Sequence, residues 1–310
     1  VTFGSENIGG DFILVRSDGS PIYNYIVIID DTLMKITHVI RGEDHLSNTP
    51  KQMLIGEALG LPLPEYAHLP LVLGPDKTKL SKRHGITSVD IYRREGYLPE
   101  ALLNYLALLG WASESGQEIM SIDDIAREFN IESMGKSAAI FDFKKLRWIN
   151  SQYIRQYPED RIIELLLPYI NEAGYDTLST EPSTLRQIIL LLRGYCEILS
   201  DIKGIIGIFL DREFSPDTEA DAMLREDYGR EIISVAAGLI DSSINENNFV
   251  SELVDQVKNN TAQKGKKLFM PLRAMITGRL KGPELDQALP LIGYKLCCER
   301  IRFCHERYVR

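Results

Sequence analysis

Four cations fall within the seven residues of segment 77–83, Lys-Thr-Lys-Leu-Ser-Lys-Arg. The segment follows the apolar run Leu71–Leu73 and a Gly74-Pro75 turn. A loop with small and hydroxyl-bearing residues between lysines can place ammonium groups on the oxygens of a polyphosphate. The alternative is a solvated lysine-rich turn, because charge runs are common on protein surfaces. The surroundings of this lysine loop, residues 77–83, decide between the two interpretations.

A second polar segment, Glu43-Asp44-His45, follows the predicted strand Thr37–Arg41. The next element is a predicted helix with Thr49 as N-cap and Pro50 in its first turn, which ends at Gly60. Open α/β sheets bind ligands at the carboxyl edge of their strands. The lysine loop leaves the next predicted strand, 68–73, so both polar segments should meet at one edge. For Glu43 to His45, a solvated turn with a capping acid remains the alternative.

The elements around these segments predict a sheet followed by helices. Residues 11–15 and 22–29 favour two strands joined by an Asp18-Gly19 turn, and Asp30–Thr32 can cap a short helical turn. The run 25–29 is continuously apolar, as in a strand covered on both faces. Helices are predicted at 98–109 and 121–129, where Ser121 and Asp124 form a capping pair. From Tyr157 onward the periodicity predicts helices only, at 159–173, 182–201, 203–210, 219–240, 246–259, 271–280 and 284–307.

Composition fits a multidomain globular protein of 310 residues, with 44% hydrophobic and 25% charged residues. No membrane-spanning run or signal peptide is apparent, so we expect a cytoplasmic protein without membrane contact. The chain does not start with Met, so we expect it to begin partway through a longer protein. The four cysteines lack zinc-ligand spacing and are expected to be reduced core thiols, with no metal site: Cys196, Cys297, Cys298 and Cys304.

Charge is unevenly distributed along the chain. The net charge of −9 argues against indiscriminate nucleic-acid binding, and no DNA partner is expected. Segment 258–281 nevertheless carries cations and no acid, whereas 211–231 is rich in acids. This segregation predicts a protein that offers polyanions one face.

These motifs, in this order, resemble those of a bacterial-type glutamyl-tRNA synthetase, a class I aminoacyl-tRNA synthetase. The segment 79–83, Lys-Leu-Ser-Lys-Arg, is similar to the Lys-Met-Ser-Lys-Ser loop of that class in its Arg-ending form. Further matches lie at 16–19, 21–24, 39–50, 96–105, 145–150, 264–273 and 277–278. The family's His-Ile-Gly-His signature and first nucleotide-binding strand are absent. We therefore expect the chain to be the carboxyl-terminal two-thirds of such an enzyme, inactive alone.

The resemblance implies a fold that combines a partial Rossmann-type α/β catalytic sheet with an all-α body. It implies that glutamate and ATP, with Mg²⁺, form an adenylate whose acyl group passes to tRNA. Such chemistry depends on neutralising phosphate charge, and Lys79 and Lys82 would do so. The other implied ATP contacts are Ser81, Arg83, Glu43, Asp44 and His45. Tyr23 and Arg41 would line the glutamate pocket, since a guanidinium suits bidentate carboxylate binding.

The same resemblance implies tRNA contacts in the helical half. Arg273 would contact an anticodon base, Lys266 and Lys267 phosphates, and Pro283 and Leu285 would lie against the bases. A merely basic helix surface is the alternative. Tyr195 stands where the family commonly has an Arg that separates glutamate from glutamine anticodons. Relaxed reading of both tRNAs is therefore expected, unless the neighbouring Arg193 substitutes.

The expected organisation has four parts. Residues 1–90 would complete the catalytic domain, 91–156 would contact the tRNA stem, and 157–212 and 213–310 would form two anticodon-binding subdomains. The expected partners are L-glutamate and tRNA for glutamate, and possibly for glutamine, bound by a monomer. Two alternative functions remain: a relaxed synthetase that charges glutamine tRNA with glutamate, and a non-catalytic tRNA-binding module.

Overall fold

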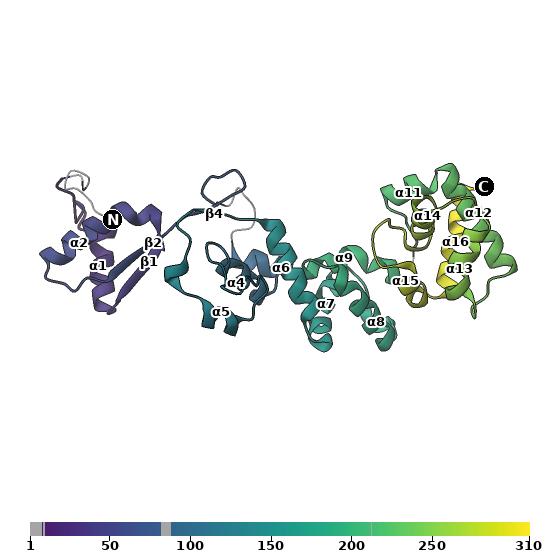
Figure 1. The fold of residues 1–310 in the computed structure, drawn as a ribbon, viewed down its shortest axis with the longest axis horizontal. Coiled ribbons are helices and arrows are strands. Elements are labelled where there is room, and N and C mark those ends of the chain that lie inside the picture. Colours follow the sequence, from purple (N-terminus) through teal and green to yellow (C-terminus); the bar gives the residue numbers. More distant parts are fainter. Residues whose placement is uncertain (1–7, 9, 82–87, 212) are drawn as a thin grey trace. The chain divides into compact units, whose positions relative to one another are not determined.

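The computed structural model describes residues 8, 10–81, 88–211 and 213–310. The described chain forms two compact units (Figure 1). The first unit consists of residues 1–88 and 103–145, and the second of 89–102 and 146–310. The finer division into four parts stays a prediction.

Two short parallel strand pairs form the sheets of the first unit. Strand β1 (His38–Gly42) pairs with β2 (Glu65–Leu69), and the two lie side by side in Figure 1. Strand β3 (Val72–Leu73) pairs with β4 (Ala139–Ile140). The predicted strand 68–73 is thus divided between β2 and β3 at Pro70, which cannot donate a backbone hydrogen bond to a sheet. The prediction of a parallel sheet is confirmed.

The predicted strand 22–29 is wrong, because Tyr23–Leu33 forms helix α1. Of the expected hairpin, only the Asp18-Gly19 turn and a single antiparallel bridge between Val15 and Pro21 are present. Asp30–Thr32 therefore lie in the last turns of α1 and do not cap another helical turn. A short apolar run does not distinguish a strand from a buried helix face, and in α1 only Ile28 is fully buried.

Helix α2 (Thr49–Ala58) follows a short 3₁₀ helix, η2 (Glu43–Asn48). Pro50 lies in its first turn and Gly60 follows its end at φ 65°, as predicted. Asn48, and not Thr49, is the N-cap residue. The Thr49 hydroxyl instead contacts side chains of the neighbouring strands, so the N-cap prediction is wrong.

The remainder of the first unit packs around a small core of Trp111, Met120 and Ile125. Helix α5 (Ile122–Glu128) begins as predicted, since the Ser121 hydroxyl accepts a hydrogen bond from the Asp124 amide at 3.1 Å. A 3₁₀ turn, η4 (Ile131–Ser133), follows it. Two helices continue from one unit into the other: α4 (Pro99–Ala107) and α6 (Phe143–Gln156).

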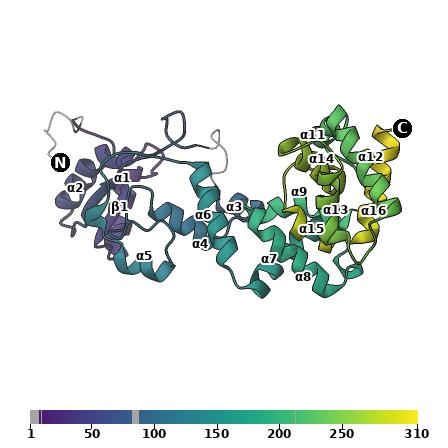
Figure 2. The ribbon, with the colours of Figure 1, turned by 45° about the vertical axis from the view of Figure 1, so that its right-hand side comes forward.

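The second unit is helical, and in its described residues no strand occurs. Helix α12 (Asp227–Ser242) packs against α14 (Lys266–Thr277) and α16 (Tyr294–Tyr308), and the three lie together in Figure 2. Its longer helices are α3 (Val89–Glu95), α7 (Glu159–Glu172), α8 (Pro182–Leu192), α11 (Thr218–Leu224), α12 (Asp227–Ser242), α13 (Phe249–Asn259), α14 (Lys266–Thr277), α15 (Leu285–Ile292) and α16 (Tyr294–Tyr308). Its short turns are η5 (Thr177–Ser179), η6 (Arg193–Tyr195), η7 (Leu199–Asp201), α9 (Ile202–Ile205) and α10 (Gly207–Leu210). The all-helical prediction for this part is confirmed.

Arg300 of α16 is a buried charge in the middle of this helical unit, with 2% of its surface exposed. Its Nη1 donates hydrogen bonds to the carbonyl oxygens of Ile208 in α10, at 2.9 Å, and Ile276 in α14, at 2.7 Å. Its guanidinium carbon lies 5.1 Å from the centre of the Phe214 ring. Burial lowers the pKa of this guanidinium. Arg300 thereby connects three helical segments through one side chain.

The helices of the described residues include none that is long and apolar enough to cross a bilayer.

Candidate functional site

The described part of the lysine loop, residues 77–81, follows β3 through a tight reverse turn. Lys79 forms an antiparallel bridge with Leu73, so the chain folds back on the strand that it leaves. Asp76 Oδ1 accepts hydrogen bonds from the Thr78 amide at 3.0 Å and the Thr78 hydroxyl at 2.7 Å. Lys77 has a left-handed backbone at φ 60°. Local hydrogen bonds therefore fix where Lys79 stands, whereas Lys82 and Arg83 lie outside the described residues.

The two polar segments meet, as the sequence predicts. Lys79 Nζ lies 2.6 Å from Asp44 Oδ2, and this hydrogen bond holds the pKa of Asp44 below its usual range. Glu43 Oε1 accepts a hydrogen bond from the Leu71 amide at 3.2 Å. Ser81 follows, half-buried. Residues just after β1 thus contact the lysine loop, through Asp44, and the residue that precedes β3, through Glu43.

Tyr23, predicted to line the glutamate pocket, lies close to His45, a predicted ATP contact. Their ring centres are 5.8 Å apart, with the planes tilted by 49°. Tyr23, on α1, is 51% exposed, and His45 Nδ1 lies 3.2 Å from Asn48 Nδ2. Both rings are therefore available at one place on the surface of the first unit.

Arg41, at the end of β1, is held by side chains that the sequence did not single out. Its Nη2 donates to Thr49 Oγ1 at 2.7 Å and to Gln52 Oε1 at 2.8 Å, and its Nε to His68 Nε2 at 3.4 Å. Burial and the Arg41 charge lower the pKa of His68, which favours the neutral imidazole that accepts this hydrogen bond. Gln52 in turn donates to Asn24 Oδ1 at 3.1 Å. Within the described part of the chain, nothing hydrogen-bonds Arg41 Nη1.

In the second unit, Arg273 holds a turn. Its Nη1 donates to the carbonyl oxygens of Gly282, at 3.0 Å, and Pro283, and its Nη2 pairs with Glu284 at 3.0 Å. The side chain is only 11% exposed. Pro283 and Leu285 are themselves largely buried. The structure therefore gives Arg273 a positioning role at this turn, and a direct base contact from it stays a prediction.

A pocket of about 350 Å³ lies beside this turn. Its apolar lining comes from α13, α14 and α15, and includes Val250, Phe269 and Leu285. Lys266 and Lys267 are exposed at the start of α14, with the Lys267 ammonium 5.6 Å from the centre of the Tyr228 ring. Aromatic and cationic groups thus lie on α14, the helix that carries Arg273.

Arg193 and Tyr195 lie in the short helix η6. Arg193 Nη1 donates to the Tyr157 carbonyl oxygen at 3.3 Å, which directs it to the protein backbone. Tyr195 is 42% exposed. Of the two residues, Tyr195 is the more accessible to a ligand.

Family comparisons agree with this two-part geometry. Residues 1–148 match the catalytic domain of class I tRNA synthetases (E and Q). Residues 161–304 match an anticodon-binding domain. The chain is similar to class I tRNA synthetases (E and Q). The synthetase match covers Lys79, Asp44 and Arg41, and the anticodon-binding match covers Arg273 and Tyr195.

Individual relatives in the synthetase family give the same result. A glutamate–tRNA ligase of Carboxydothermus hydrogenoformans is 44% identical over 94% of the chain and 62% of its own length. Glutamate–tRNA ligase 1 of Caldicellulosiruptor saccharolyticus is 43% identical over 98% of the chain and 63% of its own length. A crystal structure of a glutamate tRNA ligase from Elizabethkingia meningosepticum, in complex with its amino acid, superposes with a TM-score of 0.77 at 31% identity. That alignment covers 96% of this chain and 62% of the crystallised one. The chain thus spans about three fifths of the length of these relatives.

Proposed function

We propose that this chain supplies part of the catalytic centre and the anticodon-binding body of a ligase that joins L-glutamate to tRNA through a glutamyl-adenylate. The observation that carries the proposal is the contact between Lys79 and Asp44, which brings the lysine loop to the carboxyl end of β1. Tyr23, Arg41 and His45 lie in the same unit. An adenylate site needs cations for phosphate oxygens next to a carboxylate-binding group, and these residues provide both.

The proposed roles rest on the contacts of the described side chains and, for Lys82 and Arg83, on the family resemblance. Lys79 and Lys82 neutralise phosphate charge, with Ser81 and Arg83 supporting the loop, while Glu43, Asp44 and His45 border the nucleoside. Arg41 offers its Nη1 to a substrate carboxylate, because Thr49, Gln52 and His68 occupy its other nitrogens. Tyr23 forms the exposed side of that pocket.

Mg²⁺ is expected to accompany ATP. Among the described residues, no group of three or more His, Cys, Asp or Glu side chains is arranged to hold a metal ion. Mg²⁺ is commonly bound by one or two carboxylates together with substrate phosphates. We therefore assign the ion to the nucleotide and assign no catalytic step to it.

The decisive experiment measures ATP–pyrophosphate exchange in a full-length enzyme that carries these residues. Lys79→Ala should lower the glutamate-dependent exchange rate by about 10²-fold, the size seen when one preorganised charge donor is removed. Lys77→Ala is the matched control, since it removes the same charge from the same loop. Equal rates for the wild type and Lys79→Ala would overturn the proposed catalytic role.

For the helical unit, we propose a tRNA-binding surface around α14 in a cytoplasmic monomer that binds no DNA. The proposed boundaries at 90, 156 and 212 separate it from the catalytic and stem-contact parts. Arg273 positions the turn at Pro283 and Leu285, and Lys266 and Lys267 contact phosphates. Lys267→Ala should weaken binding of an anticodon stem-loop and reduce the salt slope by about one. An unchanged slope would exclude the phosphate contact.

The exposure of Tyr195 favours a second candidate, an enzyme that also charges glutamine tRNA with glutamate. Arg193, the possible substitute, is directed to the backbone. Parallel aminoacylation of the two purified tRNAs tests this candidate, and Tyr195→Arg should restore preference for glutamate tRNA. Strict preference in the wild type would refute relaxed specificity. Binding of tRNA without exchange activity in the full-length enzyme would instead support a non-catalytic module.

A further inference from the structure

A pocket of about 680 Å³ lies within the second unit, and none of its lining residues is assigned above to substrate or anticodon. It is formed by the α3–α4 turn, α7 and η7. Its apolar lining includes Tyr97, Leu98, Pro99, Leu165 and Leu199. The volume falls in the range of sites for small molecules and cofactors, about 300–1,000 Å³.

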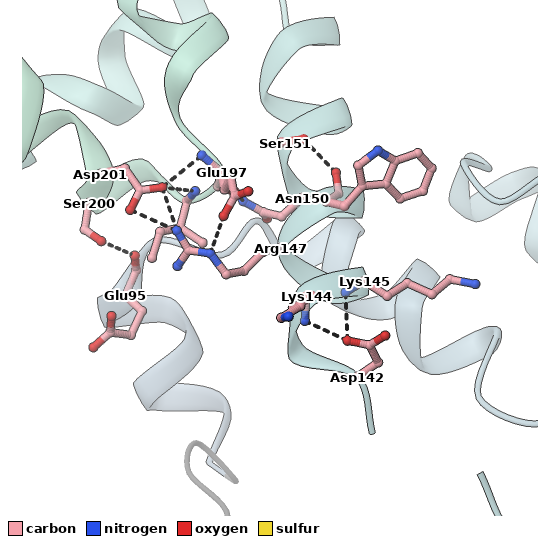
Figure 3. Close-up of polar contacts among 12 residues, drawn as sticks. Glu95, Asp142, Lys144, Lys145, Arg147, Asn150, Ser151, Glu197, Ser200 and Asp201 are labelled. Carbon is pink, nitrogen blue, oxygen red and sulfur yellow. Dashed lines mark hydrogen bonds and ion pairs between the residues drawn. The ribbon is translucent and has the colours of Figure 1, made fainter. Parts of the chain in front are cut away.

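Polar contacts between separate segments fix the walls of this pocket (Figure 3). Ser200 Oγ donates to the Glu95 carbonyl oxygen at 2.7 Å, which ties η7 to the end of α3. Arg147 of α6 lies between Glu197 and Asp201 and pairs with both, with Nη2 2.9 Å from Asp201 Oδ2. Contacts of this kind preorganise a site, because its walls do not have to be ordered when a ligand binds.

Gly96 lies in the α3–α4 turn, which forms part of the pocket wall. Its φ of 90° is left-handed, and an added Cβ would lie 2.8 Å from the Leu199 amide nitrogen. On the opposite wall, the Tyr169 hydroxyl donates to the Arg93 carbonyl oxygen at 3.2 Å. The cavity is therefore a built feature of the fold, bounded by segments that cannot move independently.

Glu100 gives the pocket an unsatisfied acceptor. It lies in the first turn of α4, and within the described part of the chain its buried Oε2 has no hydrogen-bond partner. Tyr157 hydrogen-bonds to the Glu100 carboxylate, and burial together with this bond raises the pKa of Tyr157 to about 12. A buried acceptor without a donor is costly, so a ligand that donates a hydrogen bond there is favoured.

Positive charge lies at the exposed part of the same pocket. Arg93 and Arg94 are exposed lining residues, and no acid of the described residues pairs with either. The other charged residues at the pocket are already paired, Arg161 with Glu164 and Glu172 with Lys203. The site thus combines one buried carboxylate oxygen, tyrosine rings and two guanidiniums that no acid of the described residues pairs with.

We propose that this pocket binds a nucleotide whose base carries an exocyclic amino group, with the amino group on Glu100 and the phosphate on Arg93 and Arg94. A flat base matches the apolar and aromatic lining, and a guanidinium matches phosphate geometry. A simple cation would meet Glu100 but not the two arginines. A free nucleotide and an unpaired nucleotide of tRNA share this chemistry.

The test compares AMP with IMP, which lacks the amino donor, by calorimetric titration of the full chain. AMP should bind at least about tenfold more tightly than IMP, and Glu100→Gln should remove that preference. Glu219→Gln is the matched control, because Glu219 is an exposed acid in the first turn of another helix of the same unit. Arg93→Ala should weaken the binding of AMP but not the binding of adenosine, which has no phosphate.

Three outcomes would overturn the proposal: equal binding of AMP and IMP, loss of AMP binding in Lys79→Ala but not Glu100→Gln, and binding of agmatine in place of AMP. Failure of the Lys79→Ala exchange experiment leaves this test unaffected, since no pocket residue belongs to the lysine loop. Adding tRNA distinguishes the two sources. Displacement of AMP identifies a tRNA nucleotide as the ligand, and simultaneous binding identifies a free nucleotide.

Discussion

Replacing Gly96 by Ala should destabilise the second unit far more than replacing Gly174. Both glycines have nearly the same left-handed backbone, at φ 90° and 89°, which costs a residue with a Cβ about 1–2 kcal/mol. Around Gly174 nothing lies within 4 Å of the added atom, whereas at Gly96 it would meet Leu199 Cβ at 2.7 Å and the Ser200 amide nitrogen at 2.9 Å. Such overpacking adds about 1–3 kcal/mol. Gly96→Ala should therefore lower the free energy of unfolding by roughly 2 kcal/mol more than Gly174→Ala does.

Urea unfolding measures this difference. The two tryptophans lie in different units, so a Trp111→Phe background leaves Trp148 of α6 as the reporter for the second unit. At a slope of about 2 kcal/mol/M, the Gly96→Ala midpoint should lie about 1 M below that of Gly174→Ala. Equal midpoints would show that the η7 backbone moves away without cost, and would refute the claim that this pocket wall is rigid.

Three further results are expected. Asp44→Asn should raise the KM for ATP a few-fold in pyrophosphate exchange, because Lys79 loses the partner that positions it; a lower KM would mean that Asp44 competes with phosphate. Hydrogen bonds that the Glu181 carboxylate accepts from the Ser183 hydroxyl and from the Thr184 amide, the latter at 2.7 Å, lower the pKa of Glu181 to about 2. The contribution of the ionised Glu181 carboxylate to folding stability is complete above about pH 4.5 and is lost as the pH falls towards 2. Glu181→Gln should therefore flatten the acid side of a stability–pH curve, and an unchanged curve would contradict this. Burial raises the pKa of Cys196, Cys297 and Cys304 to about 12, so a thiol reagent at pH 8 should label them only after unfolding in urea, and rapid labelling of the folded chain would disprove this burial.

Local signals in the sequence predicted structure well where a single residue decides the geometry. Ser121 and Asp124 marked the start of α5, and Gly60 the end of α2, because capping depends on neighbours within one turn. The strand prediction for 22–29 was wrong because this segment forms helix α1, which is covered on one side only. That coverage depends on packing partners distant in the chain. Helix α6 was not predicted, although Leu146, Ile149 and Ile154 are buried at helical spacing along it.

The candidate site was predictable to the extent that it depends on strand ends. Lys79 and Asp44 each follow the carboxyl end of a strand and do meet, although β3 and β1 belong to separate two-stranded sheets. The partners of Arg41 were not predictable in the same way. His68 lies opposite Arg41 only through the register of β1 and β2, and Gln52 faces it only because of how α2 is placed. Three-residue spacing between Thr49 and Gln52 on one helix face was the available signal.

Arg300 has a consequence for how the helical unit opens. Its buried charge is solvated by carbonyl groups of α10 and α14, so separating either segment leaves a guanidinium partly unsolvated in the protein interior. The three segments should therefore unfold as one cooperative unit, and their amide hydrogens should exchange with a common opening free energy. Motions that accompany the proposed tRNA binding and release then belong to the exposed turns around this unit, while α10, α14 and α16 stay together.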